Sequence, residues 1–156
     1  MKRYSNLDEE TLAQKAIELV DYCRSSGKGA VWLLQGDLGA GKTTFVRHAA
    51  RALGIQETVN SPTFNLHNFY EGTTGDLNHF DLYRLNESAM MELEFSEIWE
   101  AEPLRFTVHA IEWWDRLPSL FSKCPFFRIS LEATAEELRT LIVEESPAGR
   151  FPPNQQ

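Results

Sequence analysis

The chain has 156 residues, the size of one ordinary domain, which is enough to bury a hydrophobic core without disulfides or metals. Hydrophobic residues make up 42% of the chain and charged residues 24%, which excludes disordered, collagen-like and membrane-embedded classes. Its 15 lysines and arginines stand against 23 aspartates and glutamates, a net charge of -8. This acidic balance argues against a subunit that grips RNA or DNA directly.

The cysteines and the N-terminal residues indicate a cytoplasmic protein. Cys23 and Cys124 are far apart and form neither a CxxC pair nor a zinc spacing with the four histidines, so we expect two reduced thiols. No apolar run approaches the about 20 residues that a membrane helix needs. Residues 1–6 carry charges with no apolar signal core behind them. We therefore expect a cytoplasmic location and no membrane partner.

The first elements in chain order are a helix, a strand, a glycine-rich loop and a second helix. Apolar residues at helical spacing follow the N-cap candidate Asp8 and predict an amphipathic helix that ends near Gly27. Residues 30–34 form a short apolar run, typical of a strand buried on both faces of a sheet. Helical spacing returns after Lys42, and Gly54 is placed to end that helix.

Extended segments dominate the remainder of the chain. The predicted elements are a hairpin of residues 64–70 with 77–85, a helix over 88–101, a strand over 105–113, and a closing pair of 126–131 with 138–143. The two pairs are expected to be antiparallel. We predict a single domain over residues 1–145, followed by a disordered tail over 146–156.

The glycine-rich loop carries the strongest motif. Residues 36–43, Gly-Asp-Leu-Gly-Ala-Gly-Lys-Thr, match G-x-x-x-x-G-K-[ST] between a strand and a helix, the context that indicates a phosphate-binding loop. Glycines let successive backbone N–H groups turn toward a phosphate, and the following helix directs its positive dipole end at the same anion. Lys42 would then reach the β- and γ-phosphates, and the Thr43 hydroxyl would bind Mg2+. The predicted ATP-binding residues of this loop are Gly36, Asp37, Leu38, Gly39, Ala40, Gly41, Lys42, Thr43 and Thr44.

The fold class that follows is α/β, a three-layer P-loop NTPase-like domain with a mixed sheet. Such a site also needs an acidic residue at the end of another strand to hold Mg2+, and a polar group to orient the attacking water. Asp81 lies in an extended segment, and Glu112 ends an otherwise apolar strand, where a carboxylate is costly unless a cation or metal pairs with it. Alternatively, either carboxylate faces solvent or pairs with an arginine such as Arg84.

Residues 61–64, Ser-Pro-Thr-Phe, follow the second helix. They can place Thr63 near the γ-phosphate, as switch segments do in other P-loop proteins. The same residues can equally form a plain turn.

Together these motifs resemble one family. GDLGAGKTT (36–44), SPTF (61–64), HFDLYR (79–84), ELEF (92–95) and IEW (111–113) occur in the order and spacing of the bacterial TsaE family, also called YjeE. The resemblance implies a small ATPase of tRNA threonylcarbamoyladenosine biosynthesis that uses ATP and Mg2+. It also implies TsaB and TsaD as partners, with tRNA met only through their complex, which ATP hydrolysis resets or activates.

The resemblance also implies roles for single residues. Lys42, Asp81 and Glu112 would be catalytic, with Lys42 on the phosphates, and Thr43, Glu112 and Asp81 would serve Mg2+. Thr63 would belong to the ATP-binding set. In the family, a glycine-containing turn near the final strands lies close to the adenine, whereas this chain has Ala-Glu-Glu at 135–137.

Three other functions fit a phosphate-binding loop. A nucleotide-gated binding module would use occupancy rather than turnover to set partner affinity. A small-molecule kinase would close an arginine-bearing lid, yet residues 115–131 offer only Arg116, Lys123 and Arg128, unclustered. A GTPase is disfavoured because the chain has no Asn-Lys-x-Asp stretch to recognise guanine.

Overall fold

The computed structural model describes residues 1–152 except 38, 63–65, 84–95 and 136. Its elements in chain order are β1 (Lys2–Leu7), α1 (Glu9–Ser26), β2 (Gly29–Gln35), α2 (Lys42–Ala52), β3 (His67–Glu71), β4 (Asp76–Asp81), α4 (Ser96–Glu100), β5 (Thr107–Glu112), the 3-10 helix η1 (Trp114–Arg116), β6 (Leu120–Ser122), β7 (Phe126–Ala135), β8 (Leu138–Ser146) and β9 (Gly149–Phe151).

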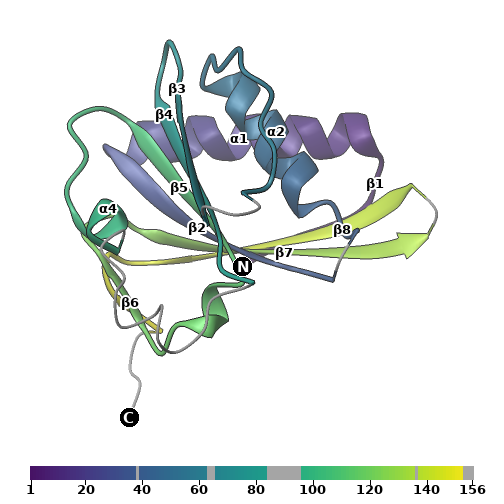
Figure 1. Cartoon of the computed structure of the whole chain (residues 1–156). Coiled ribbons are helices and arrows are strands. Elements are labelled where there is room, and N and C mark those ends of the chain that lie inside the picture. The colour runs from purple at the N-terminus through teal and green to yellow at the C-terminus, as the bar shows by residue number, and fades with distance from the viewer. Residues whose placement is uncertain (38, 63–65, 84–95, 136, 153–156) are drawn as a thin grey trace.

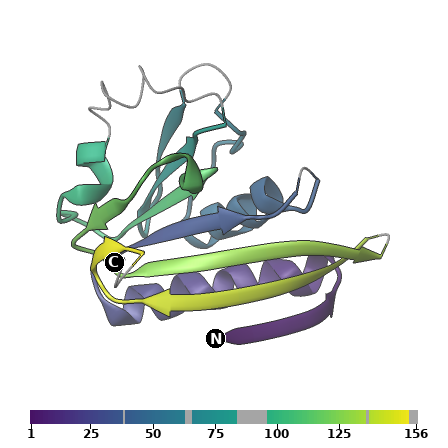
Figure 2. The same ribbon diagram turned by 90° about the horizontal axis from the view of Figure 1, so that it is seen from below.

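The main sheet has seven strands in the order β1-β8-β7-β2-β5-β4-β3 (Figure 1). The four central strands, β7, β2, β5 and β4, are parallel to their neighbours within that set. The β3–β4 and β7–β8 pairs are antiparallel, and β1 runs antiparallel to β8 along its outer edge (Figure 2). The predicted mixed sheet, with two antiparallel hairpins flanking a parallel core, is confirmed.

Both faces of the sheet are covered, which gives the three layers. Side chains alternate along β2: Ala30, Trp32 and Leu34 join the core on one face, and Val31 and Leu33 join the core on the other. Helices α1 and α2 pack on the first face, whereas α4 and the small β6–β9 sheet close the second (Figure 1). The strand that precedes the glycine-rich loop is therefore anchored from both sides.

The helix boundaries follow from local chemistry. The Asp8 carboxylate caps α1, accepting a hydrogen bond of 2.8 Å from the backbone N–H of Thr11, and this bond lowers the pKa of Asp8. Gly27 ends the helix and donates its N–H to the Cys23 carbonyl. Helix α2 begins at Lys42 directly after Gly41. These starts and stops agree with the predicted helices.

The C-terminal segment differs from the prediction. A disordered tail was expected over residues 146–156, but Gly149–Phe151 forms β9 and pairs antiparallel with β6. Phe151 is buried, with its ring centroid 5.4 Å from that of Phe126 and 5.5 Å from that of Trp114. Burial of this ring on the second face outweighs the turn-forming composition around it.

Two further expectations concern the helix over 88–101 and the cysteines. Of that helix, Ser96–Glu100 is observed as α4, and residues 88–95 lie outside the described residues. Cys23 and Cys124 are free and buried, as expected. No helix among the described residues combines the length and apolar character needed to cross a membrane.

Candidate functional site

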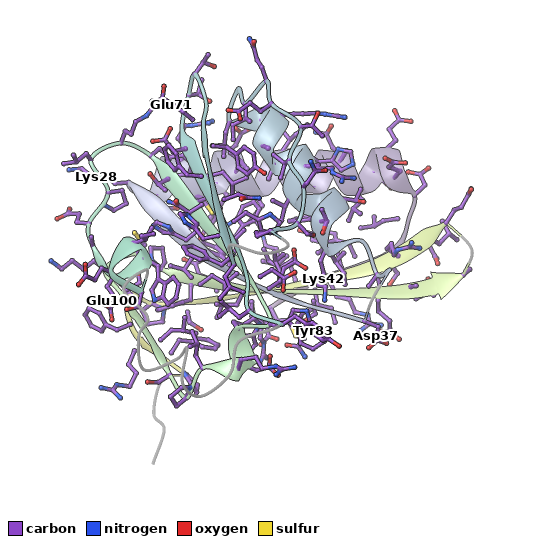
Figure 3. All side chains as sticks on the ribbon, in the orientation of Figure 1. Lys28, Asp37, Lys42, Glu71, Tyr83 and Glu100 are labelled. Atoms are coloured by element: carbon purple, nitrogen blue, oxygen red, sulfur yellow. The ribbon has the colours of Figure 1, made fainter. Side chains whose placement is uncertain are left out.

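The glycine-rich loop leaves the carboxyl end of β2, where two neighbouring strands also end. In register, Leu34 of β2 lies beside Glu112 of β5, which lies beside Asp81 of β4. Figure 3 shows Lys42 and Asp37 at this end of the sheet, with Lys28 at the opposite end. The carboxyl edge of parallel strands is where open α/β sheets bind ligands, so the candidate site lies here.

The path of the loop depends on close backbone approaches. Gly36 has a φ of +152°, and a Cβ atom there would lie 2.5 Å from the Leu131 carbonyl oxygen of β7. Gly41, immediately before α2, has a φ of +103°, in the left-handed region that glycine favours. Glycine is therefore required where the loop crosses β7 and where it turns into the helix.

Arg139 of β8 holds the loop from outside. Its Nε donates to the Ala40 carbonyl at 3.0 Å, and its Nη2 lies 3.3 Å from the Gly39 carbonyl. The guanidinium of Arg139 thus holds two consecutive carbonyls of the loop, those of Gly39 and Ala40, just before α2 begins. Sequence analysis missed Arg139, because nothing local links a residue of β8 to a loop about a hundred positions earlier.

The Lys42 ammonium group is buried against the loop it follows. Its Nζ donates to the Gly36 carbonyl at 2.7 Å and lies 4.8 Å from the centre of the Trp113 ring. Lys42 is only 8% exposed. The charge is thus placed between the loop and an aromatic face, where a cation–π contact contributes to holding it.

Three oxygen-bearing side chains meet beside Lys42. The hydroxyl oxygens of Thr43 and Ser61 are 2.8 Å apart, and Thr43 Oγ1 lies 3.5 Å from Glu112 Oε2. A hydroxyl and one or two carboxylates, completed by phosphate oxygens and water, are the donors that Mg2+ prefers. Among the described residues, no group of three or more His, Cys, Asp or Glu side chains could hold a metal alone. The donor set therefore fits Mg2+ bound together with phosphates.

Asp81 adds a second carboxylate at the same edge. Its Oδ1 accepts a hydrogen bond of 3.0 Å from the backbone N–H of Tyr83. Burial raises the pKa of Asp81, and the nearby Glu112 charge raises it further. The two carboxylates consequently differ in environment, which lets them take different roles.

Glu112 also has a partner that sequence analysis did not single out. His79 of β4 is fully buried, and its Nε2 lies 2.7 Å from Glu112 Oε2. The residue is the first of the HFDLYR motif, so the signal was present, but its role was not assigned. The alternative that Glu112 faces solvent is excluded, because its side chain is only 4% exposed.

The site residues line two neighbouring cavities. The first cavity, of about 440 Å3, is lined by Lys42 and Thr43 together with Asp81, Glu112 and Trp113. The second, of about 470 Å3, is lined by the N-terminal turn of α1, by Glu137 at the β7–β8 turn, and by Gly41, Thr44 and Arg139, which it shares with the first. The shared lining joins the two cavities across the start of α2.

The predicted site residues fall into three groups. Lys42, Thr43, Thr44, Gly39, Gly41, Asp81 and Glu112 all line the first cavity. Gly36 and Asp37 line a separate cavity of about 430 Å3, which shares Lys42 and Trp113 with the first, and Ala40 is a buried residue of the loop. Leu38 and Thr63 lie outside the described residues, as do Arg84 and residues 92–95. Of the Ser-Pro-Thr segment, Ser61 and Pro62 line the first cavity.

A mixed α/β sheet with the glycine-rich loop between its central strand and α2 defines a P-loop NTPase-like domain. The crystal structure of YdiB from Bacillus subtilis has the same fold, with a TM-score of 0.64 at 23% sequence identity, covering 93% of this chain and 84% of that one. The family model described as "Threonylcarbamoyl adenosine biosynthesis protein TsaE" matches residues 7–141. The chain belongs to the TsaE family.

Curated relatives carry the name "tRNA threonylcarbamoyladenosine biosynthesis protein TsaE". That of Treponema pallidum is 42% identical over 117 residues, which cover 74% of this chain and 82% of the relative. That of a Synechocystis strain is 44% identical over 95 residues, covering 61% of this chain. The match spans 60% of the Synechocystis protein's length.

Proposed function

We propose that this chain is the ATP-binding and ATP-hydrolysing subunit of the machinery that makes threonylcarbamoyladenosine in tRNA. The observation that carries the proposal is the meeting of Lys42, Thr43, Asp81 and Glu112 around one cavity at the end of the glycine-rich loop. Membership of the TsaE family supports the pathway. The names of the relatives support threonylcarbamoyladenosine in tRNA as the product of that pathway.

In this proposal the phosphates occupy the first cavity and the nucleoside the second. Backbone N–H groups of the loop and the N-terminus of α2 would bind the phosphates, and Lys42 would place its charge on the β- and γ-phosphates. Thr44 and Arg139 line both cavities, which supports a single ligand that spans them. Around the base, the lining contributed by Glu137 would replace the glycine turn usual in the family.

Thr43 and Glu112 would hold Mg2+, with Asp81 as a further acidic group. Bound Mg2+ supplies neutralisation of phosphate charge during transfer. Asp81 would orient the attacking water by accepting its hydrogen bond, and the raised pKa of this carboxyl group makes it a better proton acceptor than an exposed aspartate. Glu112 and Lys42 are themselves buried, so water screens their charges less than it would at the surface.

We further propose that turnover is slow without partners, and that TsaB and TsaD in the cytoplasm stimulate it. Among the described residues that line the first cavity, Arg139 is the one arginine, and the loop carbonyls engage its guanidinium. An arginine that stabilises the transferred phosphoryl group often accounts for much of the rate in P-loop enzymes. The same observation favours the second candidate, a nucleotide-gated binding module with negligible turnover.

The test is steady-state phosphate release from ATP and Mg2+ by the purified chain, titrated with TsaB and TsaD of the same organism. The control is Glu112→Gln, which keeps the size of the side chain and removes its charge. Saturable stimulation in the wild type but not in the control is the expected result. Absence of stimulation at partner concentrations where binding is demonstrated would favour the gated module. Normal phosphate release by Glu112→Gln would remove Glu112 from the mechanism.

A further inference from the structure

The buried histidine His79 contacts Glu112, the proposed Mg2+ ligand. His79 is on β4 and Glu112 on the adjacent parallel strand β5, and both side chains lie on the face of the sheet that α1 and α2 cover. His79 is 0% exposed and Glu112 is 4% exposed. A carboxylate this deeply buried requires a hydrogen-bond donor, and the 2.7 Å contact with His79 Nε2 supplies one.

The direction of this hydrogen bond follows from the groups involved. An ionised carboxylate only accepts, so Nε2 of His79 carries the hydrogen and donates it. The other ring nitrogen, Nδ1, is buried and has no hydrogen-bond partner among the described residues. Within the described part of the chain, the hydrogen bond to Glu112 is therefore the one that the imidazole of His79 makes.

The described contacts of the carboxylate converge on one of its two oxygens. Oε2 of Glu112 meets His79 Nε2 at 2.7 Å and lies 3.5 Å from the hydroxyl oxygen of Thr43. Among the described residues, no hydrogen bond engages Oε1. Holding one oxygen fixes the orientation of the carboxylate and leaves the other free to bind a ligand.

We propose that His79 is a positioning residue, which orients Glu112 for the Mg2+ that accompanies the nucleotide. This inference rests on the proposed function. Loss of the imidazole would release the Glu112 side chain to other rotamers, while the loop that binds the phosphates would stay intact. Removing a hydrogen-bonding partner of a metal ligand typically costs 10- to 100-fold in metal affinity.

The experiment compares two amide substitutions of the full chain. His79→Gln carries an N–H2 group that can reach about as far as Nε2, and His79→Asn carries the same group on a shorter side chain. The first measurement is the Mn2+ affinity of the ADP-bound protein by electron paramagnetic resonance. The second is ADP affinity in EDTA by calorimetry. A matched control, His109→Asn, removes a histidine of similar burial from the opposite face of β5.

We expect His79→Asn to lower Mn2+ affinity by about 10- to 100-fold. His79→Gln should retain most of the wild-type Mn2+ affinity, and His109→Asn should leave Mn2+ affinity unchanged. ADP affinity in EDTA should stay close to that of the wild type in all three variants. Unchanged Mn2+ affinity in His79→Asn, or an equal loss in His109→Asn, would overturn the positioning role. If the wild type itself shows no ADP-dependent Mn2+ site, the proposed function fails first and this inference with it.

Discussion

Stability at mildly acidic pH tests the burial of one histidine. His109 of β5 is 2% exposed, and burial lowers its pKa from 6.5 to about 4. Well above pH 6.5 the residue is neutral in both the folded and the unfolded chain and adds no pH dependence. Between pH 6.5 and pH 4 the unfolded chain takes up a proton that the folded chain does not, so the free energy of unfolding falls as the pH falls.

The size of this effect follows from the two pKa values. Each unit between them corresponds to about 1.4 kcal/mol, so this single residue accounts for about 3 kcal/mol of lost stability between pH 7 and pH 4. That amount is a substantial part of the 5–15 kcal/mol by which domains are typically stable.

The assay is urea unfolding at several pH values for the wild type and for His109→Gln. Glutamine is chosen because its carbonyl can accept the hydrogen bond that Asn78 Nδ2, 3.3 Å from His109 Nδ1, can donate. The difference between the two curves isolates His109 from the carboxylates, which titrate in both proteins. Equal pH slopes in the two proteins, or an NMR titration of His109 near pH 6.5, would refute the reasoning.

Three other substitutions have definite expected results. Lys42→Ala should weaken ATP binding by at least about tenfold in calorimetry, because it removes the charge proposed to contact the β- and γ-phosphates; unchanged affinity would contradict that role. Gly36→Ala should weaken nucleotide binding while far-ultraviolet circular dichroism stays native, since its Cβ would lie 2.5 Å from the Leu131 carbonyl oxygen and displace the loop; full affinity would show that the loop tolerates the shift. Phe45→Ala should lower the free energy of unfolding by about 3–5 kcal/mol in urea titrations, because this fully buried ring packs on Trp32; a loss below about 1 kcal/mol would mean that the core collapses into the space.

Local sequence patterns predicted those elements whose spacing or motif lies within a single segment. The helical spacing of α1 and α2, the apolar run of β2 and the loop motif between them each lie within one segment, and all three elements are observed. The acidic residues that end β4 and β5 were predicted separately, and the sheet register places them side by side. The motifs thus predicted candidate residues, whereas the fold determines which of these residues lie side by side.

The elements that sequence analysis missed depend on distant partners. β1 is polar and mostly exposed, and it is a strand because its backbone pairs with β8 at the other end of the chain. β6 and β9 have three residues each and pair across an intervening hairpin. Arg139 contacts Ala40 and His79 contacts Glu112, and both contacts form only in the folded chain. No short-range periodicity encodes such pairings.

The burial of Phe151 bears on how this protein can be shortened. The matched family region ends at residue 141, yet Phe151 packs against Trp114, two positions after Glu112. Ending the chain at residue 145 would remove Phe151 and expose Leu120 and Phe126 to solvent. It would also remove the ring that packs against Trp114 of η1. Such a shortened protein should aggregate more readily and hold the segment after Glu112 less firmly. The folded domain therefore extends beyond the region that the family model matches, at least to Phe151.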